Sequence, residues 1–314
     1  MDRLIKVLGN LLKRIFERKE KRYFVPQQID ISYEDILKLS QTNLERNTNL
    51  TFSRQESLDL LGQMKQFELG RSLLMNRGLN GYWTSYIVLY SGTEDIQNPL
   101  EYWLLNKAPF VRATRERFWI FQQEIQKRVH SNMILAAIPC GLMDNFLSLN
   151  YSGIKNIKLV GIDYNEQSIK LAQKNAKKYR MENKVQLIHA DAWNFDVVEH
   201  YDLITSNGLN IYESDDKRQS SLYRNFYKAL RPKGFLITSF LTPPPSSNVA
   251  SPWRNFNPAD VKKQKAIFTD IIKPKWENFR TEEMMRECLE HIGFNIIDVI
   301  DDSQRMFPTI IAQK

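Results

Sequence analysis

Cysteine and histidine are scarce in this chain, which has two cysteines and four histidines among 314 residues. Cys140 and Cys288 cannot build the disulfide framework that stabilises many secreted domains, so we expect a reducing, cytoplasmic environment. The histidines are scattered, and neither they nor the cysteines have the spacing of a metal site. We therefore expect no metal ion.

Long apolar runs are also lacking. No stretch reaches the roughly 18 consecutive apolar residues of a membrane-spanning helix, and nothing resembles a cleavable signal. Hydrophobic residues make up 42% of the chain and charged residues 25%, which is ordinary for a globular protein. A chain of 314 residues is long enough for one large domain or two smaller ones with a buried core.

Acidic residues are fewer than basic ones, and the formal net charge is +8. A modest cationic excess is usually only a solvated surface, so nucleic acid is not the expected partner. The segment from Met1 to about Lys21 places apolar and basic residues at helical spacing, which predicts a basic amphipathic helix. Such a helix can contact a membrane surface or a partner. Packing on its own protein is the interpretation that we favour.

Helical patterns without intervening strands run from residue 32 to about 77 and predict a helical preface rather than a nucleotide fold. The segment Gly78–Tyr86 follows, with aromatic residues between flexible ones. Tyr82 and Trp83 in this segment can line the mouth of a substrate site or form part of a lid. Ordinary packing explains them equally well.

A second helical region begins at Asn98 and Pro99, which have the pattern of a capped helix start. A long helix over about 113–130 then leads into the first strand. It carries Arg115 and Arg117, and a guanidinium group can form two hydrogen bonds to one carboxylate. An exposed surface of arginine and glutamate side chains is the alternative explanation for each.

The stretch from Met133 to Tyr164 organises the rest of the chain. A short apolar run, broken by Pro139 and Gly141, reads as a buried strand that ends in a tight turn. Asp144 and Asn145 follow as candidate helix caps. A second apolar run ends at Asp163, about 20 residues after the turn, as in nucleotide-binding folds. An ionised carboxylate there can accept hydrogen bonds from both hydroxyls of a ribose.

Strands and helices alternate after this stretch, as in an α/β domain. Strands are predicted at 185–189, 201–208, 235–241, 294–300 and 306–312, and helices at 168–179, 220–230 and 281–291. A segment rich in proline and lysine interrupts the alternation at about 242–280.

Three features then carry a family resemblance. Asp163 closes the second strand, Asp191-Ala192-Trp193 follows the third, and a helix leads through Leu230-Arg231-Pro232-Lys233-Gly234 into the fifth. From about residue 133 to the end, the sequence resembles the class I S-adenosylmethionine-dependent methyltransferases. The resemblance implies an α/β fold with a seven-stranded, mostly parallel, doubly wound sheet. We expect a helical domain over 1–130, a methyltransferase domain over 131–314, and an insertion at about 242–280.

The resemblance also implies a cofactor, S-adenosylmethionine, and its contacts. Asp163 would bind the ribose, Asp191 the adenine amino group, and Ala192 or Trp193 the adenine ring. The expected cofactor-binding residues are Pro139, Cys140, Gly141, Asp144, Asp163, Tyr164, Asp191, Ala192, Trp193, Ser206 and Asn207.

The turn after the first strand departs from the family pattern, which has an acid followed by glycines at alternate positions. Of these glycines only Gly141 is present. Pro139 removes an amide donor but makes the turn rigid. The acid that would meet the methionine amino group is missing, and Asp144 is the candidate to replace it. We expect the cofactor to bind nevertheless, because Gly141 permits a close backbone approach.

Methyl transfer needs little covalent help, because the protein mainly aligns the acceptor and excludes water. The loop Ser206–Glu213 lies where the family places acceptor-side residues, and Tyr212 or Glu213 could act as base or orienter. This loop lacks the Asp/Asn-Pro-Pro-aromatic signature of DNA amino methyltransferases. This absence argues against a DNA base as acceptor. We expect a small-molecule acceptor, because a pocket covered by the helical lid suits one better than a polymer. Its expected contacts are Tyr82, Trp83, Arg115 and Tyr212.

Two other classes of function remain as alternatives. The altered glycine motif also suits a protein that binds the cofactor without catalysis and serves a regulatory role. The strand–acid layout is shared with nicotinamide-dependent oxidoreductases, but the absence of Gly-x-Gly-x-x-Gly argues against that class.

Overall fold

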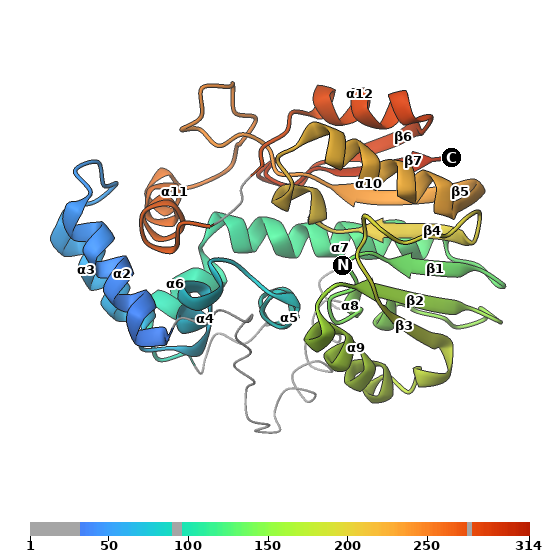
Figure 1. Cartoon of the computed structure of the whole chain (residues 1–314), viewed down its shortest axis with the longest axis horizontal. Coiled ribbons are helices and arrows are strands. Elements are labelled where there is room, and N and C mark those ends of the chain that lie inside the picture. The colour runs from blue at the N-terminus through green and yellow to red at the C-terminus, as the bar shows by residue number, and fades with distance from the viewer. Residues whose placement is uncertain (1–31, 90–95, 275–277) are drawn as a thin grey trace. The chain divides into compact units, whose positions relative to one another are not determined.

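The computed structural model of the chain describes residues 32–89, 96–274 and 278–314 (Figure 1). The predicted basic helix at Met1–Lys21 lies outside these residues. The described residues divide into two compact units. A helical unit comprises those of Met1–Arg112 and Asn257–Lys275, and a sheet unit comprises those of Ala113–Phe256 and Trp276–Lys314.

The helical unit is built from short capped helices. Ser53 begins one of them with a capping box, in which its side chain and that of Glu56 bind each other's backbone amides. Asn98 caps another by accepting from the amides of Leu100 and Glu101 at 2.9 and 3.1 Å. The first five described helices are α2 (Tyr33–Arg46), α3 (Arg54–Met64), α4 (Glu68–Asn76), α5 (Gly81–Leu89) and α6 (Pro99–Asn106).

Part of the predicted insertion belongs to the helical unit. Helix α11 (Pro258–Lys265) and the π-helical segment η3 (Ala266–Ile272) are tied to the earlier helices by side chains. The Trp103 indole donates to Asp260 at 2.7 Å, and the Thr51 amide donates to Asp270 at 2.8 Å. These bonds explain why residues 257–275 group with the helices rather than forming a separate insertion.

The sheet unit contains the predicted seven-stranded sheet. Strands β1 to β5 are parallel, and β7 is antiparallel to both of its neighbours, β5 and β6. Their order is β3-β2-β1-β4-β5-β7-β6 (Figure 1). The strands are β1 (Ile134–Ala137), β2 (Lys158–Asp163), β3 (Val185–His189), β4 (Tyr201–Ser206), β5 (Leu230–Ser239), β6 (Asn295–Ile300) and β7 (Thr309–Gln313).

Helices cover both faces of this sheet, because successive side chains of a strand point to opposite sides. Helices α10 (Asp216–Ala229) and α12 (Glu282–Ile292) pack against one face, and α7 (Pro109–Arg128) and α9 (Glu166–Lys178) against the other. The fold is therefore doubly wound, as expected. In the part of the chain that the structure describes, no helix combines the length and apolar character of a membrane span.

The two compact units divide after Arg112, whereas the sequence analysis expects the helical domain to extend to about residue 130. Helix α7 crosses this division, and the helix continues along the sheet instead of ending the helical domain. Phe121, Ile125 and Val129 on this helix are buried in the same core cluster as Leu135 of β1. Hydrophobic packing on the sheet therefore assigns most of α7 to the sheet unit.

A bulge near the start of β5 requires a glycine. Strand pairing passes from Leu230 directly to Phe235, so the residues between them bulge out of the ladder. A Cβ atom on Gly234 would lie 2.9 Å from the Arg231 carbonyl oxygen, closer than real contacts allow. The Arg231 guanidinium in turn binds Asp202 of β4 at 2.9 Å. This glycine is thus needed for the bulge at the start of β5, in the segment on which the family resemblance partly depends.

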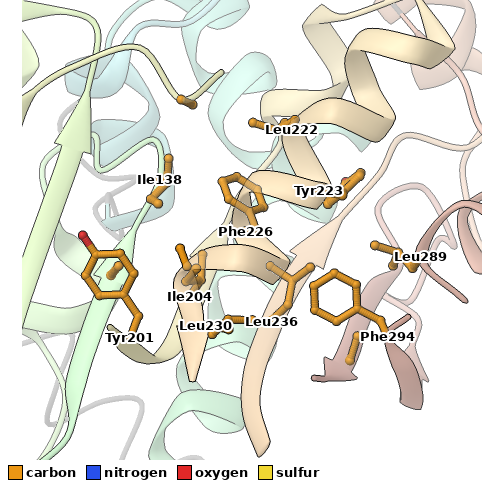
Figure 2. Packing of buried hydrophobic residues seen from close by; sticks show 14 of the residues in the cluster. Ile138, Tyr201, Ile204, Leu222, Tyr223, Phe226, Leu230, Leu236, Leu289 and Phe294 are labelled. Carbon is orange, nitrogen blue, oxygen red and sulfur yellow. The ribbon is translucent and has the colours of Figure 1, made fainter. Parts of the chain in front are cut away.

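Phe226 of α10 gives a test of this packing. Its side chain is fully buried among Ile204, Leu236 and their neighbours (Figure 2). We expect Phe226→Ala to lower the free energy of unfolding of the sheet unit by about 3–5 kcal/mol, because it leaves a cavity. Urea denaturation followed by circular dichroism measures this loss. Val198→Ala, at a side chain 60% exposed, is the control and should change little. Equal stability of both variants would contradict the assigned core.

Candidate cofactor and acceptor site

The turn after β1 lies against the end of β2. Its Ile138–Pro139 peptide is cis. The Cys140 amide donates to the carbonyl oxygen of Ile162 on β2 at 2.9 Å. Gly141 then takes a φ of +49°, in the left-handed region that favours glycine. Pro139, Cys140 and Gly141 therefore form one tight turn, fastened to the strand that carries Asp163.

Asp163 ends β2 and accepts hydrogen bonds from two backbone amides. The Gly141 amide donates to Oδ2 at 3.0 Å, and the Asn165 amide donates to Oδ1 at 2.9 Å. An ionised carboxylate has about four acceptor positions, two on each oxygen. Acceptor capacity therefore remains on the carboxylate for further donors, although the Cys140 amide also lies near enough to lower the pKa of this group. This capacity matches the two adjacent hydroxyls of a ribose.

The environment of Asp163 opposes its charge. The residue is 9% exposed, and burial raises the pKa of its carboxyl group. The amides of Asn165 and Gly141, the nearby His189 and the Cys140 amide partly offset this effect on the pKa. His189 also joins β3 to this site, because its Nε2 lies 2.7 Å from the Tyr164 carbonyl oxygen. Sequence analysis did not select His189, although its place at the end of a strand beside Asp163 was a usable signal.

Tyr164 follows Asp163 and is 77% exposed, although it continues a buried strand. Its ring centroid lies 6.1 Å from that of His189. A planar ring exposed beside a carboxylate is suited to stack on a flat aromatic group. Asp163 thus offers a carboxylate that can accept hydrogen bonds from hydroxyl groups, and Tyr164 offers an exposed aromatic ring next to it.

The helix after this turn, α8 (Asp144–Leu147), is only four residues long. The prediction that Asp144 or Asn145 caps it is wrong, because the cap is Met143, in a left-handed conformation and with no side-chain bond. Asp144 instead accepts from the Asn175 side chain of α9 at 2.9 Å. A helix of one turn has a much smaller dipole than a longer helix, so α8 contributes little positive potential at this turn. That Asp144 replaces the missing acid stays a prediction.

The segment after β3 is held by local bonds. The Asp191 carboxylate accepts from the Trp193 amide at 3.0 Å and from the Asn194 side chain at 3.3 Å. Ala192 is buried. The Trp193 indole donates to the Arg218 carbonyl oxygen of α10 at 2.9 Å, and the Arg218 guanidinium lies over its ring. Asp191 and Trp193 therefore shape this turn, and their contacts with adenine stay a prediction.

The loop after β4 begins with Ser206, which is buried, and Asn207, whose Oδ1 accepts from the Ser239 hydroxyl at 3.5 Å. A short 3-10 helix, η2 (Leu209–Tyr212), follows and ends at Tyr212, which is 49% exposed. Glu213 accepts from Arg218 at 2.7 Å. Burial opposes ionisation of Glu213, but the Arg218 bond, the Asp215 amide and the Arg218 charge together outweigh it and lower the pKa. Glu213 is thus poorly suited to act as a base.

The predicted acceptor residues lie on two units. Arg115 is half-buried on α7, in the sheet unit with Tyr212. Tyr82 and Trp83 lie on α5 of the helical unit, where the Trp83 ring is 1% exposed and meets the Tyr82 ring edge-on at 5.0 Å. Trp83 is therefore a core residue of that unit. The assignment of Tyr82, Trp83 and Arg115 to the acceptor stays a prediction.

Known proteins resemble this chain in sequence and in fold. The family model of a methyltransferase domain matches residues 137–234. A possible exported protein from Bordetella parapertussis is 39% identical, with a TM-score of 0.86 over 90% of this chain and 95% of that one. Magnesium protoporphyrin IX methyltransferase from Synechocystis, solved with bound S-adenosylhomocysteine, is 15% identical. Its TM-score is 0.52 over 74% of this chain and 94% of that one. No curated protein matches.

These matches and the strand order define an α/β methyltransferase fold. Residues 137–234 match the methyltransferase-domain family, and this match supports the predicted class I S-adenosylmethionine-dependent methyltransferase superfamily. The family prediction is confirmed, and it supports S-adenosylmethionine as the cofactor.

Cys140 gives a test of the geometry of the turn. Burial raises the pKa of its thiol, and the nearby Asp163 charge adds to this effect. Only the thiolate reacts readily with iodoacetamide. We expect Cys140 of the native protein to stay unmodified at about pH 8, a condition under which ordinary thiols react. Peptide mapping by mass spectrometry measures this, with the urea-unfolded protein as control. Equal labelling in both states would contradict the buried turn.

Proposed function

We propose that this protein transfers the methyl group of S-adenosylmethionine to a small-molecule acceptor. The observation that carries the proposal is the geometry of Asp163, whose oxygens are each fixed by one backbone amide and can accept further hydrogen bonds. The superfamily membership and the exposed Tyr164 ring beside this carboxylate support it.

Residues around Asp163 would hold the cofactor. Asp163 binds the ribose hydroxyls, Tyr164 lies against the adenine, and the turn at Gly141 admits the ligand close to the backbone. Asp191 follows β3, next to β2 in the sheet, and can accept from the adenine amine. S-adenosylmethionine supplies an activated methyl group on a positively charged sulfur. The protein then needs chiefly to orient the acceptor and exclude water.

The acceptor side lies at the end of β4 and β5. Tyr212 is the better candidate of the two side chains predicted there, because Glu213 is already bonded to Arg218. A tyrosine hydroxyl can donate a hydrogen bond to the acceptor or accept its proton through water. Two free cysteines also suit action in the cytoplasm.

A cofactor-binding protein without catalysis is the second candidate. The short α8 favours it, since the turn after β1 lacks both the family's alternate glycines and a long following helix. Cofactor binding without turnover of any acceptor would support this alternative.

Replacing Asp163 tests the proposal. We expect wild-type protein to bind S-adenosylhomocysteine with micromolar affinity in calorimetry. Asp163→Ala should weaken binding at least about tenfold, because a hydrogen bond to a charged group contributes about 1.5–3 kcal/mol. The matched control is Asp196→Ala, at a carboxylate 88% exposed. Circular dichroism must show that both variants are folded. Absence of binding by the wild type would refute the proposed function.

Tyr164 tests the adenine surface separately. Because its ring is exposed, Tyr164→Ala should leave the thermal midpoint nearly unchanged. Loss of an aromatic contact of about 0.5–1.5 kcal/mol should weaken S-adenosylhomocysteine binding by roughly two- to tenfold. Tyr164→Phe keeps the ring and should bind as the wild type does. Equal affinities of all three proteins, measured by calorimetry, would contradict the stacking role.

A further inference from the structure

Arg117 is a buried arginine without an ion-pair partner among the described residues. It lies on the part of α7 that belongs to the sheet unit and is 6% exposed. Its Nη1 donates a long hydrogen bond of 3.4 Å to the Ser239 hydroxyl. Its guanidinium carbon lies 4.3 Å from the centroid of the Phe307 ring. Its Nε is buried and has no hydrogen-bond partner.

Such an arrangement is costly unless a ligand completes it. A buried charge normally requires a paired charge and hydrogen bonds. Burial lowers the pKa of Arg117 to about 10, so the group still carries its charge at neutral pH. Tyr212 and Asp302 are its electrostatic neighbours.

Asp302 does not take the place of a partner. Its carboxylate accepts from its own loop, from the amides of Gln304 at 3.0 Å and Phe307 at 2.6 Å. It forms no ion pair with Arg117, whose Nε remains unbonded. Arg117 can therefore use its Nε–Nη2 edge, the side opposite the bond to Ser239, for another acceptor.

The contacts of Arg117 identify the part of the site that it serves. Ser239 ends β5, and Phe307 precedes β7, which begins opposite Ser239. Nη1 also lies 3.5 Å from the position of a Cβ on Gly208, directly after β4. Asp163 ends β2, three strands away from β5 in the sheet order. At about 4.8 Å per strand, this separation is roughly 14 Å. Arg117 thus lies on the acceptor side, away from the ribose-binding acid.

We propose that Arg117 binds a carboxylate group of the methyl acceptor, so that the substrate is a small organic acid. The inference rests on the proposed function and adds the class of substrate. A carboxylate fits the planar Nε–Nη2 edge with two parallel hydrogen bonds. The Phe307 ring, packed on the guanidinium, and the Ser239 hydroxyl hold this edge in place.

The test uses three small carboxylates, formate, acetate and benzoate, each compared with its amide at constant ionic strength. Binding to the protein saturated with S-adenosylhomocysteine is measured by thermal shift and calorimetry. We expect at least one carboxylate to bind the wild type at least about tenfold more tightly than its amide, as a bond to a charged group implies. Arg117→Met should abolish this preference, and Arg117→Lys should reduce it. Arg224→Met, at an exposed arginine of α10, should retain it.

The affinity of Arg117→Met for S-adenosylhomocysteine shows whether Arg117 binds the carboxylate of the acceptor or that of the cofactor. If Arg117→Met leaves that affinity within about twofold and removes the carboxylate preference, the inference holds. If the variant instead loses tenfold or more in S-adenosylhomocysteine affinity, Arg117 binds the carboxylate of the cofactor and the inference is wrong. It is also wrong if no carboxylate exceeds its amide, or if the preference survives in Arg117→Met. Wild-type protein that binds no S-adenosylhomocysteine refutes the proposed function itself. If Arg117→Met does not fold, the same measurements on Arg117→Lys replace it, and a reduced carboxylate preference with unchanged S-adenosylhomocysteine affinity supports the inference.

Discussion

The site depends on the bonds between the Asp163 carboxylate and two backbone amides. One amide belongs to Gly141 in the turn after β1, and the other to Asn165 at the start of α9. These bonds link the loop after β1 to the loop after β2, and a bound nucleotide would contact both loops. They also fix the carboxylate, so that a ligand does not have to order it. Burial opposes the charge, and the amides compensate for part of that cost.

The order of the strands places a candidate cofactor region and a candidate acceptor region at different positions along one edge of the sheet. The ends of β2 and β3 carry Asp163, Tyr164 and His189, which suit the nucleoside part of the cofactor. The ends of β4 and β5, on the other side of β1, carry the loop to Tyr212 and the contacts of Arg117. In the proposed reaction, the methionine end of the cofactor would extend from the first region to the second, where the acceptor would take the methyl group directly. Such a transfer would require alignment of the two reactants rather than a protein nucleophile.

Much of this arrangement was predictable from the sequence, since buried strands and the acid after β2 have strong local patterns. Asp163 and the helix-to-strand turn before Gly234 are examples. Contacts between distant segments were not predictable. The single-turn α8 and the bond from Asn175 to Asp144 depend on the packing of α9. The grouping of most of α7 with the sheet was not predictable either, because periodicity alone cannot indicate which partner a helix covers.

The central claim is that Asp163, fixed by backbone amides at the end of β2, binds both hydroxyls of the cofactor ribose. Calorimetric titration of the wild-type protein with S-adenosylhomocysteine and with its 2′-deoxy analogue tests it directly. The account predicts that the analogue binds at least about tenfold more weakly, because one hydrogen bond to a charged acceptor is lost. Equal affinity of the two ligands would contradict it.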